Sequence, residues 1–154
     1  MKKFIYSLFI AFALWSCGGS SNGDANQSAG SEKPAAEVKA DDGKGVGEIT
    51  NVKLNDPLNQ DMVKRGLAIY DMKCSACHKL TAQRVVGPGF AGVTDRRKPE
   101  WIMNMITNVE VMLEEDPAAQ ALFEECLTRM PNQNVSIGDA RDILEFFYDN
   151  DQGK

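Results

Sequence analysis

Apolar residues recur every three or four positions through most of the chain after residue 50, which is the spacing of one face of a helix. The clearest case follows Pro99, where Trp101, Ile102, Met105 and Ile106 keep this spacing. No stretch of this region shows the sustained alternation of apolar and polar residues, enriched in β-branched side chains, that is typical of a half-buried strand. The pattern therefore predicts an all-α fold of three to five helices.

Capping residues mark the ends of the predicted helices. They are Asp56-Pro57 or Asn59 for the first helix, the region of Pro99 for the second, Asp116-Pro117 for the third, and Ser136 with Asp139 for the last. The first helix is expected to run through DMVKRGLAIYDMKCSACHK, and the third is expected to end near Leu127. A loop rich in glycine and proline, VVGPGFAGVTDRR, separates the first two helices.

The chain begins with an apolar run of a different kind. The segment MKKFIYSLFIAFALWSCGGS places two lysines before an apolar stretch that is too short to span a bilayer. This is the pattern of a secretory signal peptide, expected over residues 1–16. The residues Leu14-Trp15-Ser16-Cys17 resemble a bacterial lipobox, in which a peptidase cuts before the cysteine and the thiol is acylated. Lipidation of Cys17 is therefore expected, and ordinary cleavage that leaves a free thiol is the alternative.

The next segment, residues 17–50, is dominated by glycine, serine, alanine and charged residues and contains no aromatic side chain. Such a composition buries too little apolar surface to offset the entropy of ordering, so a flexible tether is predicted, with the folded domain over residues 51–154. The whole chain has a formal charge of −5. This charge disfavours nucleic acid as a partner, because phosphates need a basic face.

Residues that carry chemistry concentrate in one stretch, DMKCSACHKL. It holds Cys74, Cys77 and His78, and His78 is the single histidine of the chain. A structural zinc site needs four Cys or His ligands and an iron–sulfur cluster needs four thiolates, but no second pair follows. A thioredoxin-like redox pair would accompany a βαβ pattern, which is missing. A plain disulfide would leave the histidine unexplained.

The arrangement Cys-x-x-Cys-His is instead typical of covalent haem attachment. The two thiols add to the vinyl groups of the haem as thioethers, and the adjacent histidine binds the iron. We therefore predict one covalent haem c, held by Cys74, Cys77 and His78. Because this use occupies the single histidine, no Ser-His-Asp set can be built, and the chain is expected to be an electron carrier and not an enzyme.

From these residues the chain resembles the class I monohaem cytochromes c over about residues 59–148. Gly66 and Tyr70 stand where that family has its helix-crossing glycine and aromatic residue, and Leu144 and Phe147 where its last helix packs on the first. The resemblance implies the cytochrome c fold around one haem. The residues GPGF resemble the family's loop, in which the proline carbonyl accepts the second N–H of the axial histidine, and here that proline is Pro88.

The opposite ligand of the iron is expected to be Met130. The proline that follows disfavours helical geometry at Met130, so its thioether can point inward from a loop, and the family has its distal Met-Pro segment at this place. Ligation by histidine and methionine fills both axial positions of the iron and raises the haem potential. The alternatives are other methionines, including Met103, Met105 and Met112, and Cys126 could compete as a thiolate or be an inert buried thiol.

Three further expectations concern the surroundings of the haem. Arg96 and Arg97 are expected either to pair with haem propionates or to form a solvated turn. Trp101 is expected either to donate to a propionate or to anchor its helix in the core. A group of acidic residues could steer a basic partner or simply form a soluble face: Glu110, Glu114, Glu115, Asp116, Glu124 and Glu125.

Together these features predict a membrane-tethered electron shuttle in the bacterial cell envelope, facing the periplasm. Residues 96–136 resemble lipoprotein cytochromes that accompany nitrous oxide reductase and haem domains appended to terminal oxidases. That resemblance implies a quinol-oxidising complex as the electron donor. The implied acceptor is a periplasmic reductase, with nitrous oxide reductase as the first candidate, or a terminal oxidase. The alternatives are a haem-based ligand-binding or sensor protein and a fixed haem subunit of an oxidase.

Overall fold

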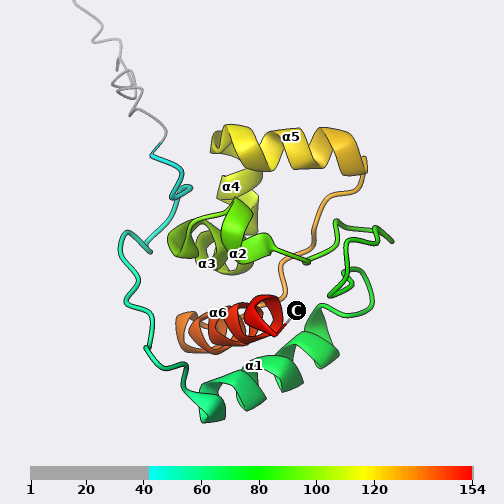
Figure 1. The fold of residues 1–154 in the computed structure, drawn as a ribbon. Helices are drawn as coiled ribbons and strands as arrows, with labels where there is room; N and C mark the ends of the chain where they lie inside the picture. The colour runs from blue at the N-terminus through cyan, green and yellow to red at the C-terminus, as the bar shows by residue number, and fades with distance from the viewer. Residues whose placement is uncertain (1–41, 154) are drawn as a thin grey trace, which may run out of the picture. The chain divides into compact units, whose positions relative to one another are not determined.

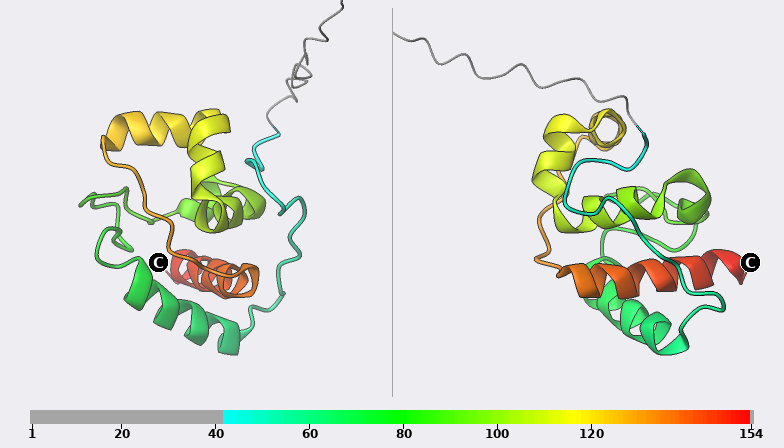
Figure 2. Two further views of the ribbon diagram at one scale, coloured as in Figure 1. Left: turned by 180° about the vertical axis from the view of Figure 1, so that it is seen from behind. Right: turned by 90° about the vertical axis from the view of Figure 1, so that its left-hand side faces the viewer.

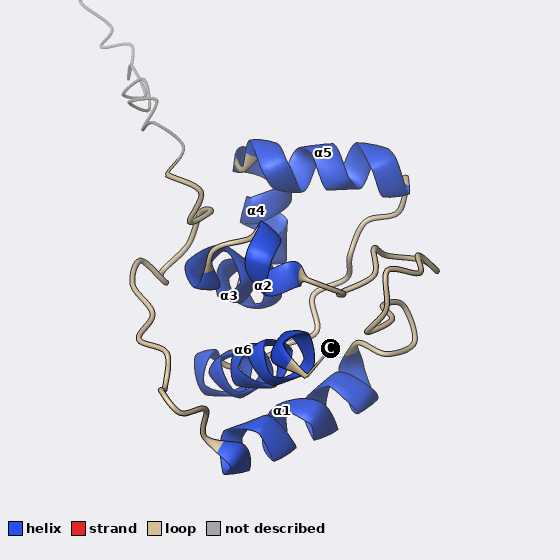
Figure 3. Ribbon diagram, viewed as in Figure 1, coloured by secondary structure: helices blue, strands red, loops and turns tan. Residues whose placement is uncertain are grey.

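The computed structural model describes residues 42–153, and this part of the chain forms helices and loops without strands (Figures 1 and 3). The helices are α1 (Gln60–Lys73), α2 (Val93–Arg96), α3 (Pro99–Thr107), α4 (Val109–Glu115), α5 (Pro117–Cys126) and α6 (Ile137–Gln152). The prediction of an all-α fold is confirmed. None of these helices is long and apolar enough to cross a bilayer.

The chain divides into two units, residues 1–37 and 38–154, and the described residues all belong to the second. Three predicted features of the N-terminal region lie outside the described residues. They are the signal peptide over residues 1–16, the lipidation site Cys17, and the tether as far as residue 41. They stay predictions.

The described residues form six helices rather than three to five, because one predicted helix is divided and one predicted loop contains a short helix. The predicted loop after His78 contains the short helix α2. The predicted helix after Pro99 is broken at Asn108, which has φ −140° and ψ 45°. The Asn108 side chain donates from Nδ2 to the Val46 carbonyl at 3.2 Å, and this contact with a distant segment holds the break.

Side-chain caps open three of the helices as the sequence predicts. Asn59, rather than Asp56, caps α1, and its side chain accepts from the N–H groups of the first turn. Asp116 accepts from the Ala119 N–H at the start of α5, and Ser136 accepts from the N–H of the third residue after it at the start of α6. Each cap satisfies a backbone donor that has no partner inside the helix.

The first and last helices pack against each other through Gly66 (Figure 1). A Cβ at this position would lie 2.1 Å from the Asp142 carbonyl oxygen of α6, so the crossing requires glycine. Beside the crossing, Arg65 donates from Nε to Asp142 Oδ2 at 2.6 Å. Leu144 and Phe147 are buried on α6 as the resemblance implies. The predicted pairing of the two helices is confirmed.

Residues 42–50 pack on the helical domain, although the sequence predicts a flexible tether up to residue 50. Ile49 is buried, and its N–H donates to Oδ1 of the buried Asn104 at 3.2 Å. In return, Asn104 Nδ2 donates to the carbonyls of Ile49 and Lys44 at 2.9 and 3.1 Å. These bonds to an α3 side chain order a segment of low apolar content, so the folded part begins before residue 51. We call residues 42–55 the N-terminal strap.

The N-terminal strap runs along one side of the helices, while the connection between α5 and α6 runs along the other (Figures 1 and 2). The long loop between α1 and α2 lies on the same side as that connection. The α1–α2 loop carries His78 and Pro88, and the α5–α6 connection carries Met130. The predicted iron ligands therefore lie on the side of the helices away from the strap.

Candidate functional site

The Cys-x-x-Cys-His stretch forms a tight turn directly after α1. The helix ends at Lys73, with Cys74 as its C-cap, and does not continue through His78 as predicted. The N–H groups of Cys77 and His78 both donate to the Cys74 carbonyl, at 3.0 and 2.9 Å. This turn brings both cysteines and the histidine to the wall of one cavity, and neither cysteine is in a disulfide.

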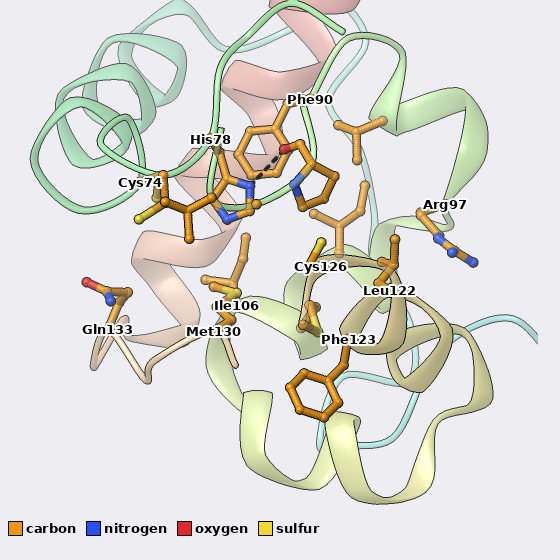
Figure 4. A pocket seen from close by; sticks show the side chains of 18 of the residues that line it. Cys74, His78, Phe90, Arg97, Ile106, Leu122, Phe123, Cys126, Met130 and Gln133 are labelled. Atoms are coloured by element: carbon orange, nitrogen blue, oxygen red, sulfur yellow. Dashed lines mark hydrogen bonds between the residues drawn. The ribbon is translucent and has the colours of Figure 1, made fainter. Parts of the chain in front are cut away.

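The His78 ring is held by the loop that follows it (Figure 4). Its Nδ1–H donates to the Pro88 carbonyl at 2.9 Å, which is the hydrogen bond implied by the resemblance. Phe90 stacks on the imidazole with ring centroids 4.5 Å apart and the planes 8° from parallel. A Cβ on Gly87 would lie 2.2 Å from His78 Cε1, so the loop can approach the ring only with glycine there. With Nδ1 bonded to Pro88, Nε2 is the nitrogen available to a metal.

Burial sets the protonation of this turn. It lowers the pKa of His78, against the opposing effect of the hydrogen bond to Pro88, and so favours the neutral ring that can ligate a metal. Burial also raises the pKa of the Cys74 thiol to about 11. The Cys74 thiol is therefore protonated at neutral pH in this fold. Within residues 42–153, no group of three or more His, Cys, Asp or Glu side chains is arranged to hold a metal ion.

Tyr70 connects the turn to the helix crossing. Its hydroxyl donates to the His78 carbonyl at 2.7 Å, and its ring lies 5.5 Å from that of Phe146 on α6. Phe90 in turn contacts Phe147, with centroids 4.8 Å apart. The aromatic residue predicted at the crossing therefore also fixes the backbone of the histidine.

The cavity beside this turn has a volume of about 550 Å³ and mostly apolar walls. The turn and the GPGF loop form one wall, while α3, α5 and residues 128–135 form the other. Met130 lies on the wall that faces His78 (Figure 4). The predicted iron ligands, separated by a long stretch of sequence, are thus brought to the same cavity.

The structure shows which of the methionines considered as the second iron ligand line the cavity and which do not. Met103 and Met112 are buried in the helical core and do not line the cavity, and Met112 Sδ accepts from the Val46 N–H at 3.1 Å. Met105 lines the cavity, as Met130 does, but its backbone lies within α3. Met130 lies in an extended segment between α5 and α6. The role of Met130 as ligand stays a prediction, with Met105 as its remaining competitor.

The other predicted residues include some that line the cavity and some that are buried in the core, and Trp101 does both. Cys126, on the last turn of α5, lines the cavity and is half-buried. Arg96 and Arg97 also line it, and the Arg97 guanidinium lies 4.5 Å from the centre of the Trp101 ring. Trp101 is buried and donates its N–H to Asp116 Oδ1 at 3.0 Å, so it anchors α3 in the core. Asp116 is buried by the same contact and does not belong to the predicted acidic surface.

Two contacts across the cavity were not predicted. Lys73 Nζ donates to the Gln133 carbonyl at 2.8 Å, and Arg84 Nη1 donates to Glu125 Oε1 at 3.3 Å. The partners are far apart in sequence, and nothing in the local pattern around any of them indicates the pairing.

The cavity fits the planar macrocycle of a haem. Its volume lies within the usual range for cofactor pockets, and its walls are apolar. Two thiols and an imidazole lie on one side and a thioether on the other, which is a donor set suited to covalent attachment and two axial bonds. Lys73, Arg96, Arg97 and Arg129 line the same cavity and could receive the carboxylates of the group.

Comparison with known proteins agrees with this site. The family model for cytochrome c matches residues 63–147. Among solved structures, a cytochrome c from Rhodothermus marinus is 30% identical, with a TM-score of 0.68, and the match covers 70% of this chain and 92% of that one. An engineered form of that protein, bound to a carbene intermediate, is 31% identical, with a TM-score of 0.64 and coverage of 69% and 91%.

A cytochrome c domain from Pseudomonas putida is also similar, at 26% identity. Its TM-score is 0.51, and the match covers 56% of this chain and 88% of that one. No curated protein matches the chain. The region matched by the family model contains the Cys74–His78 turn, Pro88 and Met130.

Proposed function

The chain belongs to the cytochrome c family, and from this premise we propose that it is a membrane-tethered shuttle that passes single electrons between respiratory proteins of the cell envelope. A cytochrome c domain binds haem c covalently and transfers electrons, so the chain is an electron carrier and not an enzyme. The proposal concerns the membrane tether, the redox partners and the roles of individual residues.

The observation that supports the proposal is that His78 and Met130 lie on facing walls of one apolar cavity beside Cys74 and Cys77. In this arrangement Cys74 and Cys77 would attach a haem through their thiols, and His78 Nε2 and the Met130 thioether would hold its iron. The bound haem supplies the one-electron couple of its iron. Pro88 and Phe90 fix the His78 ring, so this ligand would not have to move when the charge of the iron changes.

Spectroscopy of the oxidised protein tests this arrangement. The sulfur-to-iron charge-transfer band is expected in the wild-type protein, and Met130→Ala is expected to lose the band and to bind CO readily. The matched control is Met105→Leu, because Met105 lines the same cavity. Loss of the band in the control and its retention in Met130→Ala would assign the ligand to Met105. A wild-type protein that lacks the band and binds CO would favour a ligand-binding or sensor protein over a shuttle.

The membrane tether is supported by the sequence around Cys17. An acylated Cys17 followed by a flexible segment would keep the cytochrome near membrane redox proteins and raise its effective concentration there. Mass spectrometry of the mature protein and membrane fractionation test the anchor. We expect Cys17→Ala to be released from the membrane, and a variant that stays bound after signal cleavage would refute lipidation as the anchor.

The proposed electron donor is a quinol-oxidising complex, and the proposed acceptor is a periplasmic reductase, with nitrous oxide reductase first among the candidates. Residues 96–136 support this choice through their resemblance to lipoprotein cytochromes that accompany that enzyme. The test is reduction of purified nitrous oxide reductase by the reduced cytochrome in stopped-flow experiments. Faster oxidation by a terminal oxidase, or obligate co-purification with one, would assign the acceptor to the oxidase instead.

A further inference from the structure

We propose that α5 and the residue after it form the docking surface for a basic redox partner, a protein that presents lysine and arginine side chains around an apolar centre. This inference rests on the proposed function and names the chemistry of the partner. The surface, called the α5 face, consists of the exposed apolar side chains Phe123 and Leu127 with the exposed glutamates Glu114, Glu115 and Glu124.

The centre of the α5 face is apolar. Leu127 is 84% exposed just after α5, and Phe123 is 40% exposed on the last two turns of the helix. The adjoining loop contributes Val85 and Val86, which are also exposed, and the bond of Arg84 to Glu125 holds this loop against α5. Exposed apolar side chains grouped in this way are typical of an interaction surface, whereas isolated ones are common on any protein.

This centre lies directly on the cofactor cavity. Phe123 lines the cavity and also reaches the protein surface (Figure 4). Val86 lines the same edge of the cavity from the loop. A partner docked on the α5 face would therefore be separated from the haem by one layer of side chains, which is a short path for an electron.

The rim of the face is mostly acidic, with Arg84 beside Glu125 and Arg129 beside Glu114. Residues 108–128 contain six acidic residues and no lysine or arginine. Asp116 is buried, so five glutamates face solvent along α4 and α5. Glu114 is placed beside the cavity through Arg129, which lines it and lies 3.9 Å away. Exposed acidic side chains therefore lie on both helices of the face, and Glu114 is close to the cofactor cavity.

The charge of the α5 face indicates which kind of partner would bind there. A partner with a basic rim would be attracted to the net negative charge of the face, while an acidic protein or an anionic lipid surface would be repelled. Attraction of this kind accelerates the encounter between proteins, and burial of Phe123 and Leu127 then favours the oriented complex.

Stopped-flow electron exchange between the full-length haem-loaded protein and two redox proteins tests the proposal. The probes are a lysine-rich mitochondrial cytochrome c and an acidic plastocyanin. The test variant is Glu114→Gln with Glu115→Gln and Glu124→Gln. The matched control, Glu48→Gln with Asp56→Asn and Asp61→Asn, removes the same charge from exposed positions that do not line the cavity.

With the lysine-rich probe at low ionic strength, we expect the rate constant to fall about tenfold in the test variant and less than twofold in the control. The difference should vanish at about 0.5 M salt, where screening removes the attraction. Leu127→Ser should lower the rate several-fold without changing its salt dependence. Equal losses in both triple variants, or faster exchange with plastocyanin than with the basic probe, would overturn the proposal.

Voltammetry at an electrode separates this proposal from the proposed function. All variants are expected to exchange electrons with the electrode, because the substituted side chains do not hold the cofactor. A wild-type protein that fails to cycle at the electrode would contradict electron transfer itself. Normal cycling together with equal rates in the two triple variants would contradict only the docking surface.

Discussion

Lys73 and Gln133 join the two walls of the haem cavity, since Lys73 Nζ donates to the Gln133 carbonyl at 2.8 Å. Lys73 is the last residue of α1, directly before Cys74, which is predicted to attach the haem. Gln133 lies in the segment that carries Met130. This contact therefore connects the helix end beside Cys74 to the segment that carries Met130, the predicted iron ligand.

Replacing Lys73 with methionine is expected to loosen Met130. The variant keeps the apolar stem of the side chain and loses one hydrogen bond, which contributes about 1 kcal/mol. That value corresponds to about a fivefold increase in the population with Met130 detached, measured as the apparent affinity of the reduced protein for CO. The control is Lys64→Met, since Lys64 is exposed on α1 and its nearest acidic oxygen, on Asp61, is 4.0 Å away. Equal CO affinities in the two variants would show that the contact does not hold the ligand.

The helix crossing makes Gly66→Ala a destabilising change. The new methyl group would lie 2.1 Å from the Asp142 carbonyl oxygen, so α1 and α6 would have to separate. We expect the free energy of unfolding to fall by about 1–3 kcal/mol, measured by denaturant titration of the haem-loaded protein. Gly138→Ala is the control, because a Cβ there would meet only Ser136 Oγ at 3.8 Å, and its helix should be unchanged or slightly more stable. A Gly66→Ala protein as stable as this control would mean that the crossing tolerates a side chain.

Much of the site can be predicted from the sequence because its signals are local. The turn Cys74–His78 and the proline of the GPGF loop carry their chemistry within a few residues, and the helix caps Asn59, Asp116 and Ser136 lie next to the donors that they satisfy. For these features a short window of sequence contains both partners of the interaction.

The features that the sequence does not predict depend on partners far apart in the chain. The break of the helix at Asn108 is held by the Val46 carbonyl, and Trp101 finds its acceptor in Asp116. The order of residues 42–50 depends on one asparagine of α3, so composition alone indicates a tether there. Polar contacts of this kind leave no period or spacing in the sequence.

The buried carboxylate of Glu145 is expected to make stability depend on pH. Burial alone would raise the pKa of Glu145, but hydrogen bonds from the Asn59 N–H at 2.7 Å and from Asn55 Nδ2 at 3.0 Å, together with Arg141, lower it below the ordinary value of 4.5. A carboxylate whose folded-state pKa is lowered stabilises the fold above its unfolded pKa. This contribution is lost as the pH falls from about 4.5 through the folded-state value.

Glu145→Gln tests this dependence. The amide cannot titrate, and its NH₂ group faces donors instead of accepting from them, so we expect a loss of about 1–3 kcal/mol at pH 7. The difference from the wild-type protein should shrink below pH 4, measured by thermal unfolding across pH. Glu48→Gln, an exposed position, should follow the wild-type curve throughout. If the Glu145→Gln protein loses as much stability at low pH as the wild type does, the pH dependence arises from other groups.

The N-terminal strap is expected to contribute to the stability of the domain. A chain that begins at residue 51 loses the burial of Ile49 and leaves the buried Asn104 side chain without its strap partners. Together these losses should cost about 2–4 kcal/mol relative to a chain that begins at residue 42. Thermal unfolding of the two haem-loaded domains measures this difference in stability. Ile49→Ala in the longer domain should lower its stability by part of the same amount. If the two domains unfold at the same temperature, residues 42–50 act only as a tether and the boundary predicted from composition is adequate.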